Sequence, residues 1–279
     1  MNWKLTTRFM RCGWRAALWK TEMVRINAAR AKLARGEPVL GVGVQQITGA
    51  PAAGLARRCG FDFVFIDIEH SAVDAAAAAN IAAAALPLGI APLVRVPGKN
   101  SPDLARLLDG GAQGIVVPHV DDADEAAAAV RACKYPPLGM RSFFALQPHF
   151  DYVRLPAVQA MALANAEILC IVMLESPRAI ANAASIAAVP GVDVLMIGCN
   201  DLSLELGIPG QLEDPAIEAA CAAVIAACAA HGKHPGLGGI ADAALLKRRI
   251  AAGMRFVLAS NDTDLLIAAG EARVASLTL

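Results

Sequence analysis

The feature that most restricts the fold of this chain is a regular alternation of short apolar runs with longer stretches of helical composition. The runs are rich in valine, isoleucine and phenylalanine, which favour strands. Strands that alternate with helices pair in parallel, and eight of them predict a TIM-type (β/α)8 barrel of the α/β class. The runs are Val39–Val44, Phe61–Ile66, Ala91–Val96, Gly114–Pro118, Ile168–Leu174, Val192–Ile197, His234–Leu237 and Phe256–Ala259.

An open doubly wound sheet is the alternative arrangement for such a pattern. No GxGxxG sequence follows the first run, which weakens a dinucleotide-binding fold of that kind. The 279 residues suit one large barrel domain. We expect residues 36–279 to form the barrel, and residues 1–35 to form an N-terminal extension and a first helix.

Two segments call for comparison with targeting or membrane sequences. Met1–Lys20 is basic but lacks the continuous apolar region of a secretory signal, so we expect a plain extension. Ala75–Val94 carries no charge and resembles a membrane span. Pro87 and Gly89 interrupt it and favour a helix that ends near Leu86, followed by a strand. We therefore predict no membrane span.

Charge and cysteine content restrict the partners and the compartment. The 25 basic and 25 acidic side chains balance, so a surface for nucleic acid is not expected. The seven cysteines are odd in number and show no CxxC spacing. This pattern predicts a reducing cytoplasm and no disulfide framework.

Polar side chains collect where the predicted strands end, which is where barrel enzymes carry their chemistry. Because parallel strands of a barrel end at one mouth, we expect these side chains to lie close together. They are Asp67, Glu69 and His70 after the second run, Arg95 at the end of the third, Glu175 after the fifth, and Cys199, Asn200 and Asp201 after the sixth.

Glu175 and Asp201 offer two hard carboxylate ligands, a small set typical of Mg²⁺ or Mn²⁺ sites that retain water or substrate oxygens. A 2-oxo acid can complete such a site through its carboxylate and keto oxygens. The alternative is that each acid caps a helix, Glu175 near Pro177 and Asp201 at Leu202. The residues alone leave both interpretations open.

Three further side chains have a catalytic and a structural interpretation. His70 suits a general base near neutral pH or a hydrogen-bonded structural residue. Arg95 suits stabilisation of an enolate oxygen or a buried ion pair with Asp67 or Glu69. Asp109 lies at a helix C-terminus, where a carboxylate opposes the helix dipole, so holding a histidine explains it better than capping does.

The remaining polar features are less informative. Backbone N–H groups at Gly198-Cys199-Asn200 can bind a carboxylate or form an ordinary turn. No lysine lies inside a predicted strand, which disfavours a Schiff-base aldolase. Tyr135–Pro156 is a long loop of the kind that is usually functional. The other histidines lack metal-ligand spacing, and we expect surface or loop positions for His119, His149, His231 and His234.

At these residues the chain resembles the HpcH/HpaI aldolase/citrate lyase family, in particular its 4-hydroxy-2-oxoheptanedioate and 2-keto-3-deoxy sugar acid aldolases. The resemblance extends from about Gly36 to the C-terminus, and the order and spacing of several motifs match together. The motifs are FDFVFIDIEH, PLVRVPG, LLDGGAQGIVVPHVD, YPPLGMRS, VMLES and MIGCNDLSLELGIPG.

The resemblance implies a metal-dependent (class II) aldolase that cleaves a 4-hydroxy-2-oxo acid to pyruvate, or a related 2-oxo acid, and an aldehyde. It implies that Glu175 and Asp201 bind Mg²⁺, Mn²⁺ or Co²⁺, and that His70 is the base. Asp109 matches the acid that raises the basicity of that histidine, and Arg95 matches the residue that stabilises the enolate.

The resemblance also implies a substrate site and an assembly. Cys199, Asn200 and Asp201 fall where the family binds the pyruvate carboxylate, and Met173 stands where the family usually has a glutamine that contacts substrate. Proline of the usual GPAD or GPND turn is replaced by Cys199. Family members form homohexamers, built as trimers of dimers that exchange their last helix.

Three alternatives remain at this stage. An acyl-CoA lyase of the citryl- or malyl-CoA type and an oxaloacetate decarboxylase use the same metal and enolate chemistry. A barrel without catalytic activity, serving in binding or assembly, is the alternative from another class. The polar positions at the strand ends favour an enzyme.

Overall fold

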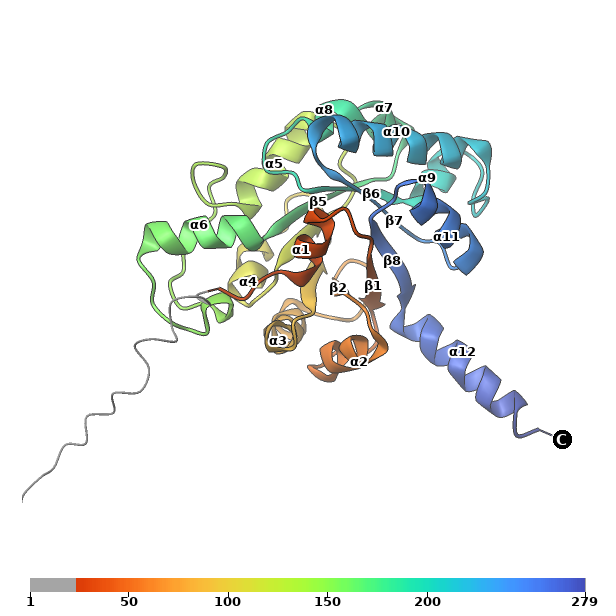
Figure 1. The fold of residues 1–279 in the computed structure, drawn as a ribbon, viewed down its shortest axis with the longest axis horizontal. Helices are drawn as coiled ribbons and strands as arrows, with labels where there is room; N and C mark the ends of the chain where they lie inside the picture. Colours follow the sequence, from red (N-terminus) through yellow and green to blue (C-terminus); the bar gives the residue numbers. More distant parts are fainter. Residues whose placement is uncertain (1–23, 279) are drawn as a thin grey trace, which may run out of the picture.

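The computed structural model describes residues 24–278, in which eight parallel strands close into one barrel, each paired with the next and the last with the first (Figure 1). The predicted TIM-type (β/α)8 barrel is confirmed, and the open sheet is excluded because β8 pairs with β1. The strands are β1 Val39–Val44, β2 Phe63–Asp67, β3 Ala91–Arg95, β4 Gly114–Val117, β5 Leu169–Leu174, β6 Val194–Gly198, β7 His234–Gly238 and β8 Phe256–Asn261.

Helices surround the barrel, and many of their inward positions are alanines that pack closely on the strands. The helices are α1 Ala28–Ala34, α2 Pro51–Cys59, α3 Ala75–Ala85, α4 Leu104–Asp109, α5 Ala123–Cys133, α6 Ala157–Glu167, α7 Pro177–Ala181, α8 Ala183–Ala187, α9 Cys199–Glu205, α10 Pro215–His231, α11 Ala243–Ala252 and α12 Asp262–Ala275, with short 3-10 turns η1 Leu86–Leu88 and η2 Pro148–Phe150. The single helix predicted over Pro177–Ala188 is divided at Asn182.

The uncharged segment that resembled a membrane span forms α3, η1 and then β3, as predicted. Across residues 24–278, no helix combines the length and the apolar character needed to cross a bilayer. The cysteines in this part of the chain are free thiols.

Large side chains fill the barrel interior, and α1 closes the end at which the strands begin. Phe63 and Phe256 stack with ring centroids 4.4 Å apart. A Cβ at Gly41 would lie 1.9 Å from the Phe63 ring, so only glycine fits there. Ala29 and Leu33 of α1 belong to the same interior cluster, and therefore α1 is part of the barrel core. The division at residue 35 stays a prediction, and the prediction for Met1–Lys20 lies outside the described residues.

The loop after α5 is anchored by a buried histidine. His149 is 1% exposed, and its Nε2 donates a hydrogen bond to the Ala112 carbonyl at 3.0 Å. Burial lowers the pKa of His149 to about 4. Of the surface or loop position expected for His149, the loop is confirmed and the surface is excluded, because the loop packs its imidazole against the turn before β4.

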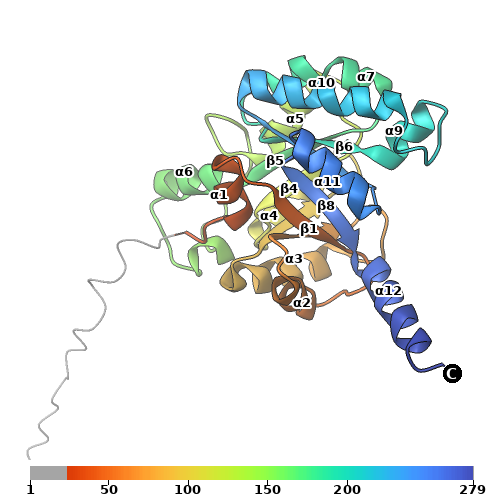
Figure 2. The same cartoon turned by 45° about the vertical axis from the view of Figure 1, so that its right-hand side comes forward.

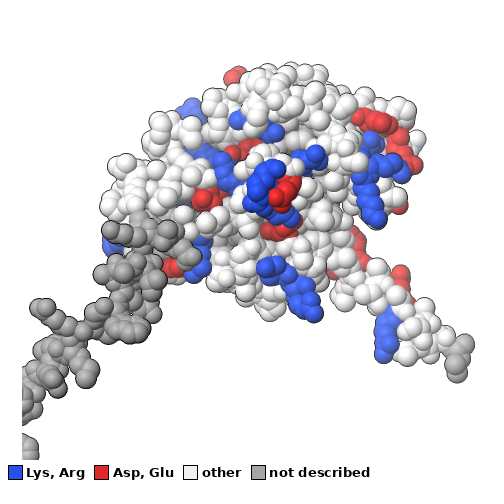
Figure 3. All heavy atoms as spheres, viewed as in Figure 1, with Lys and Arg blue, Asp and Glu red and all other residues white. Residues whose placement is uncertain are grey.

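Helix α12 extends away from the barrel, as Figures 1 and 2 both show. None of its residues is buried. Two of its apolar side chains, Leu266 and Val274, are 76% and 66% exposed. Figure 3 shows basic and acidic side chains interspersed on the face of Figure 1, with a mostly uncharged surface along α12. Unlike the other outer helices, α12 has no buried face.

Candidate active site

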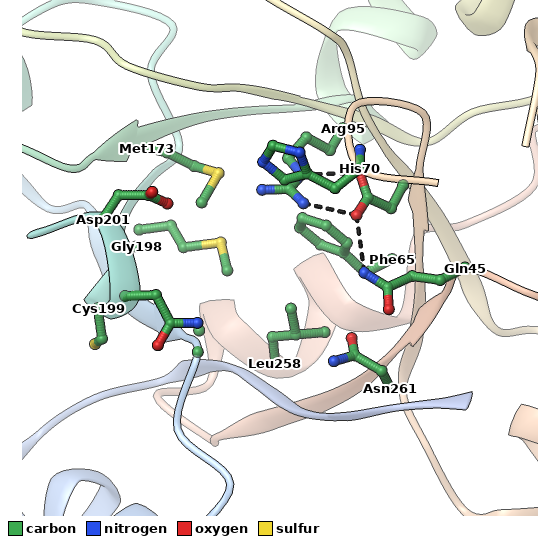
Figure 4. A pocket seen from close by; sticks show the side chains of 15 residues that line it. Gln45, Phe65, His70, Arg95, Met173, Gly198, Cys199, Asp201, Leu258 and Asn261 are labelled. Atoms are coloured by element: carbon green, nitrogen blue, oxygen red, sulfur yellow. Dashed lines mark hydrogen bonds and ion pairs between the residues drawn. The ribbon is translucent and has the colours of Figure 1, made fainter. Parts of the chain in front are cut away.

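The carboxyl ends of the strands surround a cavity of about 190 Å³ at one mouth of the barrel (Figure 4). Side chains from β2, β3, β5 and β6 meet there, as predicted from the strand ends. The cavity is lined by Gln45, Phe65, Asp67, His70, Arg95, Met173, Met196, Gly198, Cys199, Asn200, Asp201, Gly238, Gly239, Leu258 and Asn261.

Arg95 is held rigidly at the edge of this cavity. Its Nε and Nη2 donate to the two carboxylate oxygens of Asp67 at 3.0 and 2.6 Å, and its Nη1 lies 3.2 Å from Glu69 Oε2. Burial raises the pKa of Asp67, but the hydrogen bonds and charge of Arg95 outweigh this, so the pKa lies below its ordinary value. The structural interpretation of Arg95 as an ion-pair partner is confirmed, and the pairing fixes the guanidinium beside the cavity.

Asp67 also orders the segment that carries His70. Its Oδ1 accepts the backbone N–H groups of Glu69 and His70, each at 3.1 Å. The His70 side chain is 60% exposed and its Nε2 lies 3.7 Å from Glu69 Oε2. His70 therefore reaches the cavity from a fixed backbone with an accessible imidazole, facing Asp201 and Met173 in Figure 4.

Glu175 is buried behind Gly198, which lines the cavity. Its side chain is 3% exposed, and its Oε2 accepts the backbone N–H of His119 at 2.7 Å. A Cβ at Gly198 would lie 2.5 Å from Glu175 Oε1, so glycine is needed for this carboxylate to reach the start of α9. Burial raises the pKa of Glu175, and the negative charge of Asp201 adds to the rise.

Neither acid acts as a helix cap. Ser176, not Glu175, caps α7, since its hydroxyl accepts the Ala179 N–H at 3.0 Å. Helix α9 begins at Cys199 with Gly198 as its N-cap, and Asp201 lies inside the first turn. The capping alternatives for Glu175 and Asp201 are thus excluded, which leaves the two carboxylates without a capping role.

Asp109 lies elsewhere. Its Oδ1 accepts from Arg141 Nη2 at 2.6 Å, and the Arg141 guanidinium stacks on Tyr135, 4.6 Å from the ring centroid. The structure therefore does not bring Asp109 to His70 within one chain. A buried arginine 32 residues further along the chain pairs with this carboxylate, and the role of Asp109 in holding a histidine stays a prediction.

Three cavity or near-cavity residues were not singled out from the sequence. Gln45 donates to Asp67 Oδ2 at 3.1 Å, Asn261 ends β8 at the cavity, and His119 contacts Glu175. Each follows or ends an apolar run, so the rule that selected Asp67 and Glu175 applied to them equally. The surface or loop expectation for His119 missed its contact with the site.

Comparison with known proteins agrees with this geometry. The sequence profile of the HpcH/HpaI aldolase/citrate lyase family matches residues 49–269. The chain belongs to this family. Among curated relatives, a 4-hydroxy-4-methyl-2-oxoglutarate aldolase of Chaetomium globosum is 41% identical over 249 residues, covering 88% of this chain and 92% of the relative.

Further relatives in the family are similar over most of their length. A 4-hydroxy-2-oxo-heptane-1,7-dioate aldolase of Salmonella typhimurium is 36% identical, covering 89% of this chain and 94% of that protein. The crystal structure of an HpcH/HpaI aldolase from Desulfitobacterium hafniense superposes with a TM-score of 0.84 at 30% identity, covering 89% of this chain and 95% of that one. The resemblance stated from the motifs is confirmed, as is its carbon–carbon lyase class.

Proposed function

We propose that the protein is a metal-dependent aldolase that reversibly cleaves a 4-hydroxy-2-oxo acid to pyruvate, or a related 2-oxo acid, and an aldehyde. One observation carries the proposal: Asp201 lines a cavity with a fixed Arg95 and an accessible His70, and Glu175 lies buried directly behind Gly198 of that cavity, where the charge of Asp201 acts on it. Membership of a family whose relatives are named aldolases supports it.

The donor set fits a divalent cation. Glu175 is buried next to the like charge of Asp201, and both effects raise its pKa; a cation between two such groups relieves their repulsion. Within residues 24–278 no cluster of three His, Cys, Asp or Glu side chains forms a ligand cage. Two carboxylates with open positions suit Mg²⁺, Mn²⁺ or Co²⁺ better than a closed zinc site. When bound, the cation supplies Lewis acidity to the 2-oxo acid.

The chain's own residues supply the proton transfer and charge stabilisation. His70 removes the proton from the 4-hydroxyl group, the C3–C4 bond breaks, and its electron pair moves onto the 2-oxo acid as an enolate. Arg95 stabilises the enolate oxygen from a position that Asp67 and Glu69 hold. Backbone N–H groups of Cys199, Asn200 and Asp201 lie at the first turn of α9, where they can bind the substrate carboxylate.

Met173 and Asp109 complete the account of the predicted residues. Met173 lines the cavity and offers the 2-oxo acid an apolar contact where the family usually has an amide. Asp109 pairs with Arg141 within one chain, and its role as the acid that raises the basicity of His70 stays part of the proposal.

The test is pyruvate release from a panel of 4-hydroxy-2-oxo acids, measured with a coupled dehydrogenase after EDTA treatment and after adding Mg²⁺, Mn²⁺ or Co²⁺. We expect activity to disappear with EDTA and to return with a cation, together with stoichiometric aldehyde. Pyruvate from oxaloacetate without aldehyde would indicate a decarboxylase, and cleavage of a CoA thioester would indicate an acyl-CoA lyase. A chain inactive on all of these would contradict the proposal.

We also propose that the protein works in the cytoplasm as a homohexamer, a trimer of dimers. Helix α12 leaves an apolar groove of about 660 Å³ against β1 and α2, with Leu265 and Leu266 on one side and Val44, Leu55 and Phe61 on the other. A second copy that contributes its own α12 would cover these side chains. Free thiols in the described part of the chain suit a reducing compartment.

Substituting the exposed face of α12 should break this assembly. We expect the wild-type chain to have a mass in light scattering several times its 28.9 kDa, and Leu266→Asp combined with Val274→Asp to shift it toward smaller species. Val158→Asp, which changes another highly exposed apolar residue on α6, is the matched control and should leave the mass unchanged. A wild-type monomer would contradict the proposed assembly.

A further inference from the structure

His119 places its backbone N–H and its imidazole Nδ1 against a single carboxylate oxygen. The backbone N–H of His119 lies 2.7 Å from Glu175 Oε2, and the imidazole Nδ1 lies 3.1 Å from the same atom. The Glu175 side chain is 3% exposed, so water has little access to replace either contact. A buried carboxylate is stabilised by such close polar partners.

The backbone conformation of His119 makes this double contact possible. Its φ of 55° lies in the left-handed region that non-glycine residues rarely adopt. The next residue anchors the same turn, since the Val120 N–H donates to the Met173 carbonyl of β5 at 3.0 Å. The turn after β4 is thereby tied both to β5 and to Glu175, which follows that strand.

The two carboxylate oxygens of Glu175 have different neighbours. Oε2 is occupied by His119, whereas Oε1 lies toward Gly198, where even a Cβ would come within 2.5 Å. Gly198 is the N-cap of α9, which carries Asp201. Oε1 is therefore the oxygen directed to the start of that helix and its acid.

The outer nitrogen of His119 faces a second acid of the site. Its Nε2 lies 3.8 Å from Glu69 Oε1, and Glu69 in turn lies 3.2 Å from Arg95 Nη1. The imidazole thus lies between the carboxylate of the proposed metal site and the acid that helps to hold Arg95.

We propose that His119 is a positioning residue, which aims the Glu175 carboxylate at the divalent-cation site by binding Oε2 and leaving Oε1 free. The inference rests on the proposed function, because it assumes that Glu175 is a metal ligand. It assigns no proton transfer to His119.

The experiment measures Mn²⁺ affinity without substrate, from the EPR signal of free Mn²⁺, for the full chain and its variants. His119→Gly removes the imidazole and also relaxes the left-handed backbone, so the fold should be kept. Partners that orient a metal ligand typically contribute about 10- to 100-fold in metal affinity, and we expect a rise of that size in the Mn²⁺ dissociation constant. His119→Asn tolerates the same φ and offers a side-chain N–H, and should stay within about threefold of wild type, by the same scale.

His231→Asn is the matched control, since it makes the same change on an exposed histidine at the end of α10. Thermal unfolding of each metal-free variant should show a Tm for His119→Gly no lower than that of wild type. Unchanged Mn²⁺ affinity in His119→Gly would overturn the inference, as would an equal loss in folded His119→Asn. A wild-type chain without Mn²⁺ affinity would overturn the proposed function, and this inference with it.

Discussion

Removing Arg95 should lower kcat for pyruvate release by about 10²- to 10³-fold, the usual effect of deleting one preorganised donor to a developing oxyanion. Asp67 binds Nε and Nη2 of the guanidinium and Glu69 lies against Nη1, so the side chain cannot swing away from the cavity. A group fixed in this way stabilises the enolate oxygen without reorganising during the reaction. Stopped-flow or steady-state assays at a saturating cation concentration measure this change in kcat.

The Arg95 substitution has to be separated from its effect on folding. Asp67 is 1% exposed, and breaking a buried ion pair on one side typically costs about 3–5 kcal/mol. Arg95→Met alone should therefore lower Tm as well as kcat. In Arg95→Met combined with Asp67→Asn both buried charges are removed, so much of the Tm should return while kcat stays low. Wild-type kcat in the folded double variant would remove Arg95 from the mechanism.

Replacing Glu175 with glutamine should abolish metal-dependent turnover while stabilising the metal-free protein. The amide has the same shape but lacks the negative charge that binds a cation, and we expect at least a 100-fold loss of Mn²⁺ affinity, the upper end of what even indirect ligand partners contribute. Burial and the charge of Asp201 raise the pKa of Glu175, so the ionised form is disfavoured in the folded state. Removing that charge should raise Tm at pH 7.

The pH dependence gives a signed check on this substitution. A group whose pKa is higher in the folded than in the unfolded state stabilises the fold most below its unfolded pKa, and this contribution is lost as pH rises through the folded pKa. The difference in Tm between Glu175→Gln and the metal-free wild type should therefore shrink as pH falls from 7 toward 4.5, the ordinary value for glutamate. A difference that grows over this range would contradict the raised pKa.

Glu205→Gln is the control for the acids of the site, because Glu205 lies at the end of α9 and is exposed. It should leave Mn²⁺ affinity, turnover and Tm close to wild type. Asp201→Asn should behave like Glu175→Gln in Mn²⁺ affinity. If either acid could be neutralised without loss of affinity, the proposed two-carboxylate site would be wrong.

Local patterns were enough to predict the barrel and most of its mouth. Apolar runs such as Phe61–Ile66 are long enough to form the strands of a barrel wall. The polar residues that follow them, including Asp67 and Glu175, lie at the carboxyl end of the barrel because every strand runs in the same direction. The same reasoning should have included Gln45, His119 and Asn261. The amides of Gln45 and Asn261 suggested no particular chemistry and His119 lacked metal-ligand spacing, although the positions of all three at strand ends pointed to the mouth.

Partners across the fold could not be read from these patterns. Arg141 reaches Asp109 from a loop 32 residues away, and His149 is buried against Ala112; in each case the pairing depends on how a long loop folds back. Likewise, the choice between capping and metal binding for Glu175 required the positions of Ser176, His119 and Gly198.

The order of residues along this chain already determines its strands, their common direction and the acids at their ends, because these follow from local periodicity and from chain direction alone. Only the closed barrel decides which side chains meet, since hydrogen bonds and ion pairs depend on distances between segments that are far apart in the chain. The contact of His119 with Glu175, 56 residues apart, is of this second kind.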